Sequence, residues 1–459
     1  MNIQTPNPSL PVQGIARPLR SGVARHRWFN DWQGASGIPL RALVDEVAAL
    51  LAQYEADIGA RQRKRRPEDQ VRYLAAVEGT VANLAYAALI PPETGRLAVL
   101  TGHSRKGFGR YDNPAYGKPF AGLLGALREL GLLSMHAPSS RRREAGTIEP
   151  TPLFADMVAS AGIGVADFCR LPREELVTLK RKPPRDPGDA VGGPPGFVDY
   201  PETTDTRAMR ASVERINTHL EGADITFVDD GLGPVDHLQR RLVRRFTLLA
   251  EEKAPHFGKC GRLYGGFWQN LKRARRAGIR INGEPVVDLD FASMFPRLAY
   301  ATTGKEPPAG DLYAIEGLGP EYRSALKLAV NTFLFDTHNR RHTWPDPEDN
   351  EAPQLPAGWT VSRTRKAILK RHPALKSCFG TSLGYGLMRT ESDILVSVLE
   401  EMRSRGIVGL GIHDGLLLPS SRAEEGKQIM ETIGWEITGQ RLPVASKPTT
   451  TAPPLSTIY

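Results

Sequence analysis

The spacing of apolar residues predicts helices and short strands in the first third of the chain. Apolar positions recur with helical periodicity over residues 40–58 and 81–89. Between residues 120 and 130 they recur every three or four positions, which predicts a helix that ends at a glycine. Residues 132–136 and 147–152 are apolar segments on either side of a charged stretch. We expect these two segments to form strands joined by a turn.

The order of helix, strand, charged turn and strand resembles a winged helix-turn-helix domain, over about residues 81–160. In such domains the recognition helix enters the major groove of DNA and the wing contacts phosphate. The turn carries Arg141, Arg142 and Arg143, which the resemblance assigns to a wing that contacts duplex DNA. Winged helices also serve as protein-docking modules, and that alternative stays open.

Two apolar runs in the second half of the chain each deliver an aspartate. One run, residues 285–290, ends in Asp290, and the other, residues 409–418, contains Asp414. We expect both runs to be strands that bring their carboxylates to one place. Mg²⁺ prefers oxygen ligands, and a pair of metal ions stabilises the attacking and leaving oxygens of phosphoryl transfer. The aspartates therefore suggest nucleotidyl transfer, although each alone is also an ordinary strand-end residue.

A segment between the two aspartates has a basic face. Arg323, Lys327 and Asn331 are spaced four residues apart, which places them on one face of a helix. Two cations and an amide on one face can hold a triphosphate and its base. The alternative is an amphipathic helix with a solvated basic face.

Taken in order, these segments resemble the palm and fingers of template-dependent DNA polymerases, chiefly those of family A. Residues 290–297 resemble motif A, residues 323–335 resemble motif B, and His413-Asp414 resembles the core of motif C. Residues 261–271, with Gly-Arg-Leu followed by Gln-Asn-Leu, are similar to the family segment that precedes motif A and contacts the primer-template. Phe379-Gly380-Thr381 is similar to the family's Gln-Gly-Thr.

The resemblance covers residues 206–459 and implies an α+β fold with a right-hand palm, fingers and a small thumb. It implies DNA primer-template and dNTPs as partners and two Mg²⁺ ions as cofactors, with Mn²⁺ as an alternative. The resemblance assigns metal binding to Asp290, the Phe291 carbonyl and Asp414. It assigns catalytic charge neutralisation to Arg323 and Lys327, and nucleotide binding to these two and to Phe295, Asn331 and Phe335. Primer-template binding falls to Arg262, Gln269, Asn270 and His413.

The chain departs from the family A pattern at two positions. Family A has a glutamate five residues after the motif A aspartate and another after His-Asp, where this chain has Phe295 and Gly415. Motif A here reads more like family B. Without the third acid, the metal site rests on two aspartates, with Asp288 either an extra ligand or a structural residue. The aromatic Phe295 implies exclusion of ribonucleotides, with core packing as the alternative.

Composition sets further bounds. The formal net charge of +9 and a pI near 9.4 suit a polyanionic partner. Cys169, Cys260 and Cys378 are far apart, so we expect reduced thiols and no zinc site. No apolar run approaches the ~20 residues of a membrane span, and no signal-peptide pattern precedes the first element. We therefore expect a cytoplasmic protein without a membrane partner.

Proline, glycine and charge are dense over residues 180–205, which predicts an extended linker. We expect an N-terminal region over residues 1–179 and a polymerase domain over 206–459. Within the latter, residues 209–220 and 238–249 predict two thumb helices.

The favoured interpretation is a DNA polymerase without a proofreading exonuclease, serving the replication or repair of a plasmid, phage or other mobile element. One alternative is a primase or RNA polymerase on the same palm. The other is a winged-helix replication initiator or regulator with an inactive palm.

Overall fold

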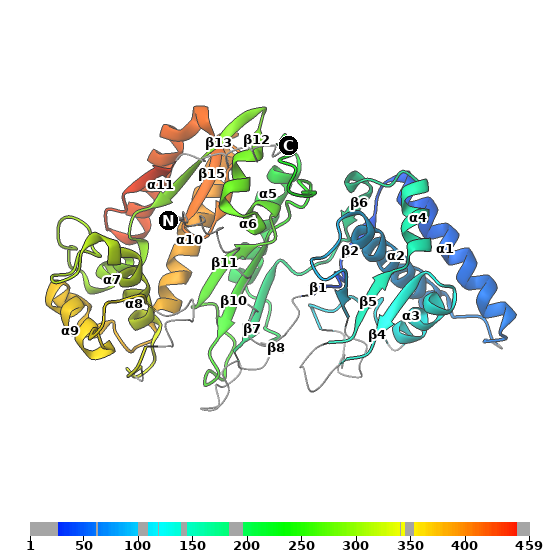
Figure 1. The fold of residues 1–459 in the computed structure, drawn as a ribbon, viewed down its shortest axis with the longest axis horizontal. Coiled ribbons are helices and arrows are strands. Elements are labelled where there is room, and N and C mark those ends of the chain that lie inside the picture. The colour runs from blue at the N-terminus through cyan, green and yellow to red at the C-terminus, as the bar shows by residue number, and fades with distance from the viewer. Residues whose placement is uncertain are drawn as a thin grey trace, which may run out of the picture. The chain divides into compact units, whose positions relative to one another are not determined.

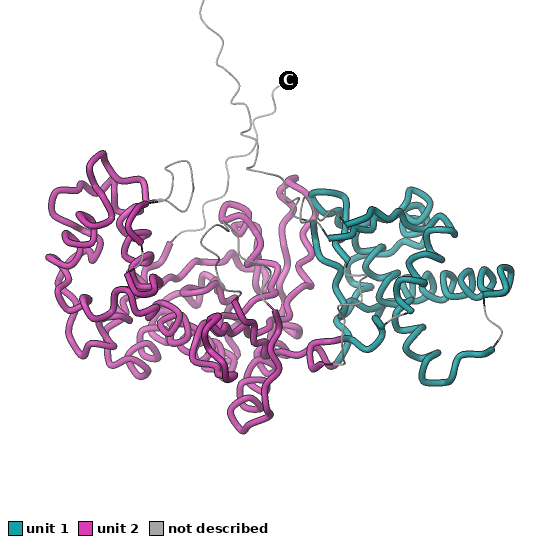
Figure 2. Tube along the Cα trace, turned by 90° about the horizontal axis from the view of Figure 1, so that it is seen from below, with its two compact units in different colours: residues 1–107, 113–172 teal, residues 108–112, 173–459 magenta. Residues whose placement is uncertain are grey.

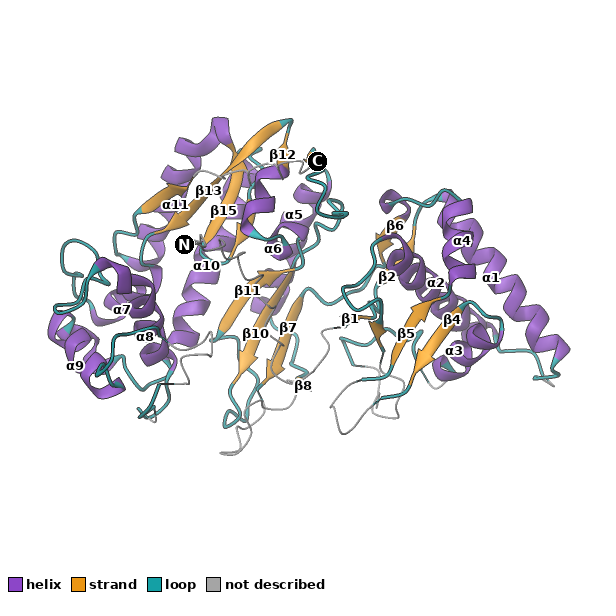
Figure 3. Cartoon of the chain, viewed as in Figure 1, coloured by secondary structure: helices purple, strands orange, loops and turns teal. Residues whose placement is uncertain are grey.

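The computed structural model describes residues 26–60, 63–99, 109–117, 119–138, 145–182, 196–339, 341–344 and 353–447. The chain forms two compact units, which Figure 2 shows in different colours. The first comprises Met1–Gly107 and Asn113–Pro172, and the second comprises Phe108–Asp112 and Arg173–Tyr459. The expected mixture of helices and strands is present in both (Figure 3).

The described residues of the first unit include four α-helices. The three helices predicted from apolar spacing are confirmed as α1 (Ile38–Asp57), α2 (Pro67–Leu89) and α3 (Phe120–Glu129), and a fourth, α4, spans Pro152–Ser160. Helix α2 begins well before the predicted residue 81. Its start is favoured by Pro67 in the first turn and by Glu68 and Asp69, whose charges suit the helix dipole.

A small sheet completes this unit. Its strands lie in the order β1 (Arg27–Trp28), β3 (Leu97–Ala98), β5 (Thr147–Pro150) and β4 (Leu133–His136), and β4 and β5 are antiparallel, as predicted. Strands β2 (Gln33–Ala35) and β6 (Phe168–Arg170) form a separate pair. Arg141, Arg142 and Arg143 lie outside the described residues, so the wing and its DNA contact stay predictions.

The main sheet of the second unit holds both aspartate runs. Its strand order is β14 (Leu410–Ile412), β15 (Gly415–Pro419), β13 (Glu284–Phe291), β12 (Ile279–Ile281) and β9 (Ile225–Phe227), and β16 (Val444–Lys447) also pairs with β13. Helices α10 (Leu383–Ser404) and α11 (Ala423–Thr438) pack against each other and contribute to the same core (Figure 1).

A second sheet corrects the predicted thumb and linker. Its order is β11 (Cys260–Tyr264), β10 (Val243–Leu248), β7 (Val177–Arg181) and β8 (Gly196–Phe197). The predicted helix over 238–249 is wrong, because β10 alternates between exposed and buried side chains and pairs on both edges. Because β7 pairs with β10, the boundary between the units falls at Pro172, before the expected residue 179.

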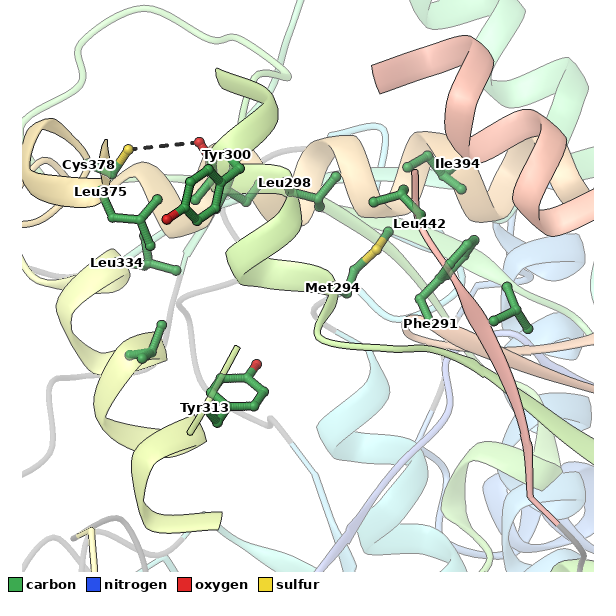
Figure 4. Packing of buried hydrophobic residues seen from close by; sticks show 14 of the residues in the cluster. Phe291, Met294, Leu298, Tyr300, Tyr313, Leu334, Leu375, Cys378, Ile394 and Leu442 are labelled. Atoms are coloured by element: carbon green, nitrogen blue, oxygen red, sulfur yellow. Dashed lines mark hydrogen bonds between the residues drawn. The ribbon is translucent and has the colours of Figure 1, made fainter. Parts of the chain in front are cut away.

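Shorter helices complete the described part of the second unit. They are α6 (Phe267–Asn270), α7 (Met294–Thr303), α8 (Arg323–Phe335) and α9 (Val361–Arg371), and the predicted helix over 209–220 is confirmed within α5 (Thr204–Glu221). Figure 4 shows Phe291 and Met294 beside residues of α7 and α10 in the core. Among the helices of the described segments, none is long and apolar enough to cross a bilayer.

Candidate active site

The structure brings the two predicted aspartates together. Asp290 is the second-last residue of β13, and its backbone partner in β15 is Gly415. Asp414 lies in the tight turn between β14 and β15, immediately before Gly415. The Phe291 amide donates a hydrogen bond to the Asp414 carbonyl over 3.3 Å. The two carboxylates therefore belong to neighbouring strands at one level of the sheet.

Gly415 stands where a third acid was expected, and packing explains it. A Cβ atom on Gly415 would lie 2.5 Å from the Leu289 carbonyl oxygen and 3.3 Å from Asp290 Oδ1. The first distance is a clash with backbone, which cannot rotate away as a side chain can. The glycine thus permits the close approach of β13 and β15 that sets the Asp290 carboxylate beside Asp414.

The electrostatic surroundings of Asp290 and Asp414 favour the binding of a cation. Burial and then the Asp290 carboxylate raise the pKa of Asp414, and the positive charges of Lys327 and Arg262 oppose that rise. The Lys447 ammonium of β16 pairs with the Asp290 carboxylate. Lys447 thus neutralises Asp290, whereas the pKa of Asp414 stays raised. An additional cation beside Asp414 would therefore stabilise its ionised form.

The donor set fits Mg²⁺ in a particular way. Within the described segments, no group of three or more His, Cys, Asp or Glu residues could hold a metal ion. Mg²⁺ commonly binds through one or two carboxylates and completes its shell with water and substrate phosphates. Two aspartates meet that requirement. Asp288 lies on the same strand face, and burial and Asp290 raise its pKa as they raise that of Asp414, so both of its predicted roles stay open.

Helix α8 carries its three polar residues as predicted. Lys327 is exposed, and its charge reaches Asp414. Arg323 donates to Asp311 over 2.7 Å and lies over the Tyr313 ring at 5.1 Å. The Asn331 side-chain oxygen is buried and accepts no hydrogen bond. An unpaired buried carbonyl is costly, so it is a natural place for a ligand donor.

Aromatic residues border the same space. The Phe295 ring is half-buried and lies 5.6 Å from the Phe335 ring, centroid to centroid. Phe335 in turn meets Tyr385 edge-on at 5.0 Å. The Arg262 guanidinium lies 5.9 Å from the centre of the Phe295 ring. Phe295 is thus partly covered by core residues yet still accessible beside a cation, which keeps both of its predicted roles open.

The residues predicted to hold the primer-template divide into two kinds. Asn270 is exposed, and His413 adopts a left-handed conformation, with φ of 53°, beside the Tyr264 ring. Burial and the charges of Arg262 and Arg276 lower the pKa of His413, so it is neutral at pH 7. The Gln269 amide instead donates to the Leu263 and Gly411 carbonyls and accepts from the Gly265 amide. Gln269 therefore supports the backbone beneath the turn.

Sequence reasoning missed a buried carboxylate. Glu391 of α10 is 1% exposed and accepts two hydrogen bonds from Arg262, at 2.9 and 3.0 Å. Burial outweighs the attraction of Arg262 and raises the pKa of Glu391 to about 7, and Asp414 and Asp290 add to that rise. A signal was present: Glu391 interrupts an apolar helical stripe between Leu387 and Ile394.

A second missed residue is Tyr313, which is buried beside the base of α8 (Figure 4). Its hydroxyl hydrogen-bonds Ser293, and burial together with the Asp414 charge raises its pKa. No motif in the sequence singles out Tyr313, because it comes from the loop between the two predicted motifs.

Comparison with known proteins assigns no family. No protein-family model and no curated protein matches the chain. Among solved structures, the chain is similar to the POL domain of Pol1 from M. smegmatis in complex with DNA primer-template and dNTP. The match has 10% identity and a TM-score of 0.28, and it covers 90% of this chain and 66% of that one.

Proposed function

We propose that the chain is a template-dependent DNA polymerase that extends a primer by two-metal nucleotidyl transfer. The observation that carries the proposal is the position of Asp414 in the turn just before Gly415, the strand partner of Asp290, in reach of the Lys327 charge. Nucleotidyl transfer needs carboxylates that hold metal ions and a cation nearby that neutralises phosphate. The reason is that phosphoryl transfer is catalysed largely by positioning and charge neutralisation.

Asp290, Asp414 and the Phe291 carbonyl would hold two Mg²⁺ ions, which stabilise the charge of the attacking and leaving oxygens when bound. Lys327 and Arg323 would neutralise the triphosphate, and Arg323 would exchange Asp311 for phosphate as it binds.

The nucleotide itself would meet three side chains of the chain. Phe335 would border the nascent base pair, and the buried Asn331 oxygen would gain a donor from the nucleotide or a bound water. The Phe295 ring would lie under the sugar and exclude a 2′-hydroxyl.

Arg262, Asn270 and His413 would contact the primer-template. Arg262 is held by Glu391 through two of its five N–H donors, so the others are available to a nucleic acid. We place Gln269 in a supporting role, since the backbone already uses both ends of its amide.

The test is primer extension by the full chain with a labelled primer on a DNA template, Mg²⁺ and either dNTPs or rNTPs. Asp290→Asn and Asp414→Asn should each reduce incorporation by at least about 10²–10³-fold, the scale expected when one strong transition-state interaction is removed. DNA affinity should change little, because it comes mainly from Lys and Arg. Asp230→Asn is the matched control, since Asp230 pairs with Arg275 on the surface of the same unit.

Each alternative function has its own outcome in this assay. A wild type that prefers rNTPs would replace the proposal with a primase or RNA polymerase. A wild type that binds DNA but incorporates nothing, with either metal, would favour an initiator with an inactive palm. The absence of an acid at Gly415 is compatible with the proposal, because strand packing accounts for the glycine.

A further inference from the structure

One face of the second sheet is basic and aromatic, and the proposed active site leaves most of it unused. Arg245 pairs with Arg262 across β10 and β11, and Thr247 pairs with Lys180 across β10 and β7. Paired residues share a face, as do alternate residues of one strand. Arg262, Arg245 and Lys180 therefore point the same way, and Phe197 joins them because it pairs with Lys180.

The opposite face of this sheet is buried. Val177, Leu179, Phe246 and Leu248 form a core cluster there. The strands that carry the basic face are thus fixed by packing from behind, which makes the face a preformed platform.

The cations of this face lie against aromatic rings. Lys180 Nζ is 4.4 Å from the centre of the Phe197 ring, and the Arg245 guanidinium is 4.9 Å from that of Tyr264. Phe197 is 54% exposed, although the Tyr111 ring stacks on it at 4.5 Å, centroid to centroid. Interleaved cations and exposed rings are the elements with which proteins bind single-stranded nucleic acid, since rings stack on bases and cations pair with phosphates.

The cations also crowd one another. None of the residues in β7, β8, β10 or β11 is acidic. Burial and the charge of Arg245 lower the pKa of Lys180. A phosphate backbone would place an anion beside these two cations.

The face is continuous with the proposed active site. Tyr264 lies 6.1 Å from the His413 ring, and Arg262 lies 5.9 Å from the Phe295 ring. Neighbouring strands are about 4.8 Å apart, so the distance from Arg262 to Lys180 spans two strand spacings, on the order of 10 Å. A nucleic acid strand that leaves the active site over β11 would cross Arg245 and reach Lys180.

We infer that this face, formed by Lys180, Phe197, Arg245 and Tyr264, binds a single-stranded segment of DNA beside the active site. The inference rests on the proposed function for the identity of that segment, which is the unpaired template next to the primer end. Phosphates pair with Lys180 and Arg245, and bases contact the rings of Phe197 and Tyr264.

Binding of a labelled DNA hairpin with a single-stranded template overhang tests the inference without any need for catalysis. Fluorescence anisotropy of the full chain is measured over a range of salt concentrations. Lys180→Gln/Arg245→Gln should weaken binding about tenfold or more and reduce the salt slope by about two, one for each phosphate that the protein no longer neutralises. Phe197→Ala should weaken binding about tenfold, with little change in the salt slope.

Two comparisons make the result specific. A blunt hairpin without the overhang should bind the variants and the wild type alike. Arg405→Gln/Arg422→Gln removes the same charge from α10 and the segment before α11, where both arginines pair with glutamates, and should leave overhang binding unchanged. The glutamine variants keep long side chains, and unfolding midpoints verify that the sheet is intact.

The inference is overturned if the Lys180/Arg245 variant binds the overhang as tightly as the Arg405/Arg422 control. It is also overturned if blunt duplex binding falls as much as overhang binding, since the face would then bind duplex. Failure of the proposed function gives a different result: the wild type would bind the overhang through this face and still add no nucleotide.

Discussion

The buried polar groups of the first unit and those around Asp290 in the second unit are used in different ways. In the first unit, buried polar side chains hold the backbone: the Asn83 amide bonds Asn30 and Gly79, and Thr80 donates to the Ala76 carbonyl. Around Asp290 in the second unit, buried groups instead face one another as charges, as in Glu391 with Arg262. A polar group that stabilises the fold usually has its hydrogen-bond partner within the protein. Groups that bind a ligand more often have a shifted pKa or an unpaired atom.

Helix α3 of the first unit has an exposed surface with few polar side chains. Its exposed positions include Ala121 and Gly122, and a Cβ on Gly122 or Gly125 would meet nothing within 4 Å. Arg128 pairs with the adjacent Glu129. Such a helix offers few groups that read base edges. If the first unit is a winged helix, duplex contact through phosphates fits it better than base-specific readout.

The largest expected effect tests whether the units are separable. A fragment that begins at Arg173 keeps β7 and β8 and should fold and extend primers, although it loses Tyr111, whose hydroxyl bonds Leu179 and Val198. A fragment that begins at Thr206 loses β7, the partner of β10 along most of its length, and should fail to fold. Circular dichroism and primer extension of both fragments check this, and an active Thr206 fragment would show that the second sheet is dispensable.

The next effect concerns the strand contact beneath the aspartates. Gly415→Ala forces a methyl group against the Leu289 carbonyl and should cost about 3 kcal/mol of folding free energy. It should also reduce incorporation at least about tenfold, because β13 and β15 must separate. Gly386→Ala on α10, where a Cβ meets nothing within 4 Å, is the matched control. Equal urea midpoints for the two variants would mean that the close approach of β13 and β15 at Gly415 does not contribute to stability.

Glu391 gives an effect of similar size that depends on pH. Its pKa of about 7 lies above the ordinary value of 4.5, so the folded protein binds more protons than the unfolded chain between those values. The resulting stability is complete at low pH and is lost as pH rises through about 7. Relative to the wild type, the free energy of unfolding of Glu391→Gln should therefore rise between pH 5 and pH 8, by up to about 3 kcal/mol.

Urea unfolding without metal measures this difference. Glu400→Gln is the control, since Glu400 lies on the same helix and pairs with Arg215 and Arg403, but away from the aspartates. A Glu391→Gln variant whose stability tracks the wild type at every pH would show that folding does not shift the pKa of Glu391.

The smallest expected effect tests Phe295. Phe295→Ala should raise rNTP incorporation about tenfold relative to dNTP, because a steric barrier is removed without a change at the metal ligands. Phe379→Ala is a control for the loss of a core ring, as Phe379 is 5% exposed in the same cluster. Single-nucleotide extension with dCTP and CTP gives the ratio. An unchanged ratio in Phe295→Ala would assign the ring to packing alone.

Local spacing in the sequence predicted much of this architecture. The helix over residues 323–335 and the strand that ends near Asp290 follow from periodicity, which is a local property. The order of the motifs also indicated that Asp290 and Asp414 meet. The second sheet was not predictable in this way, because β10 pairs with β7 across a proline- and glycine-rich stretch that reads as linker.

The sequence by itself determined which residues carry charge at motif-like positions, and hence the chemistry that the chain can attempt. Only the tertiary structure decided how those residues are used. Gly415 is explained by the approach of a strand far away in sequence, and the roles of Glu391 and Gln269 follow from partners on other elements. Burial and strand register depend on the whole fold, and they set the pKa of Glu391 and the shared face of Lys180 and Arg245.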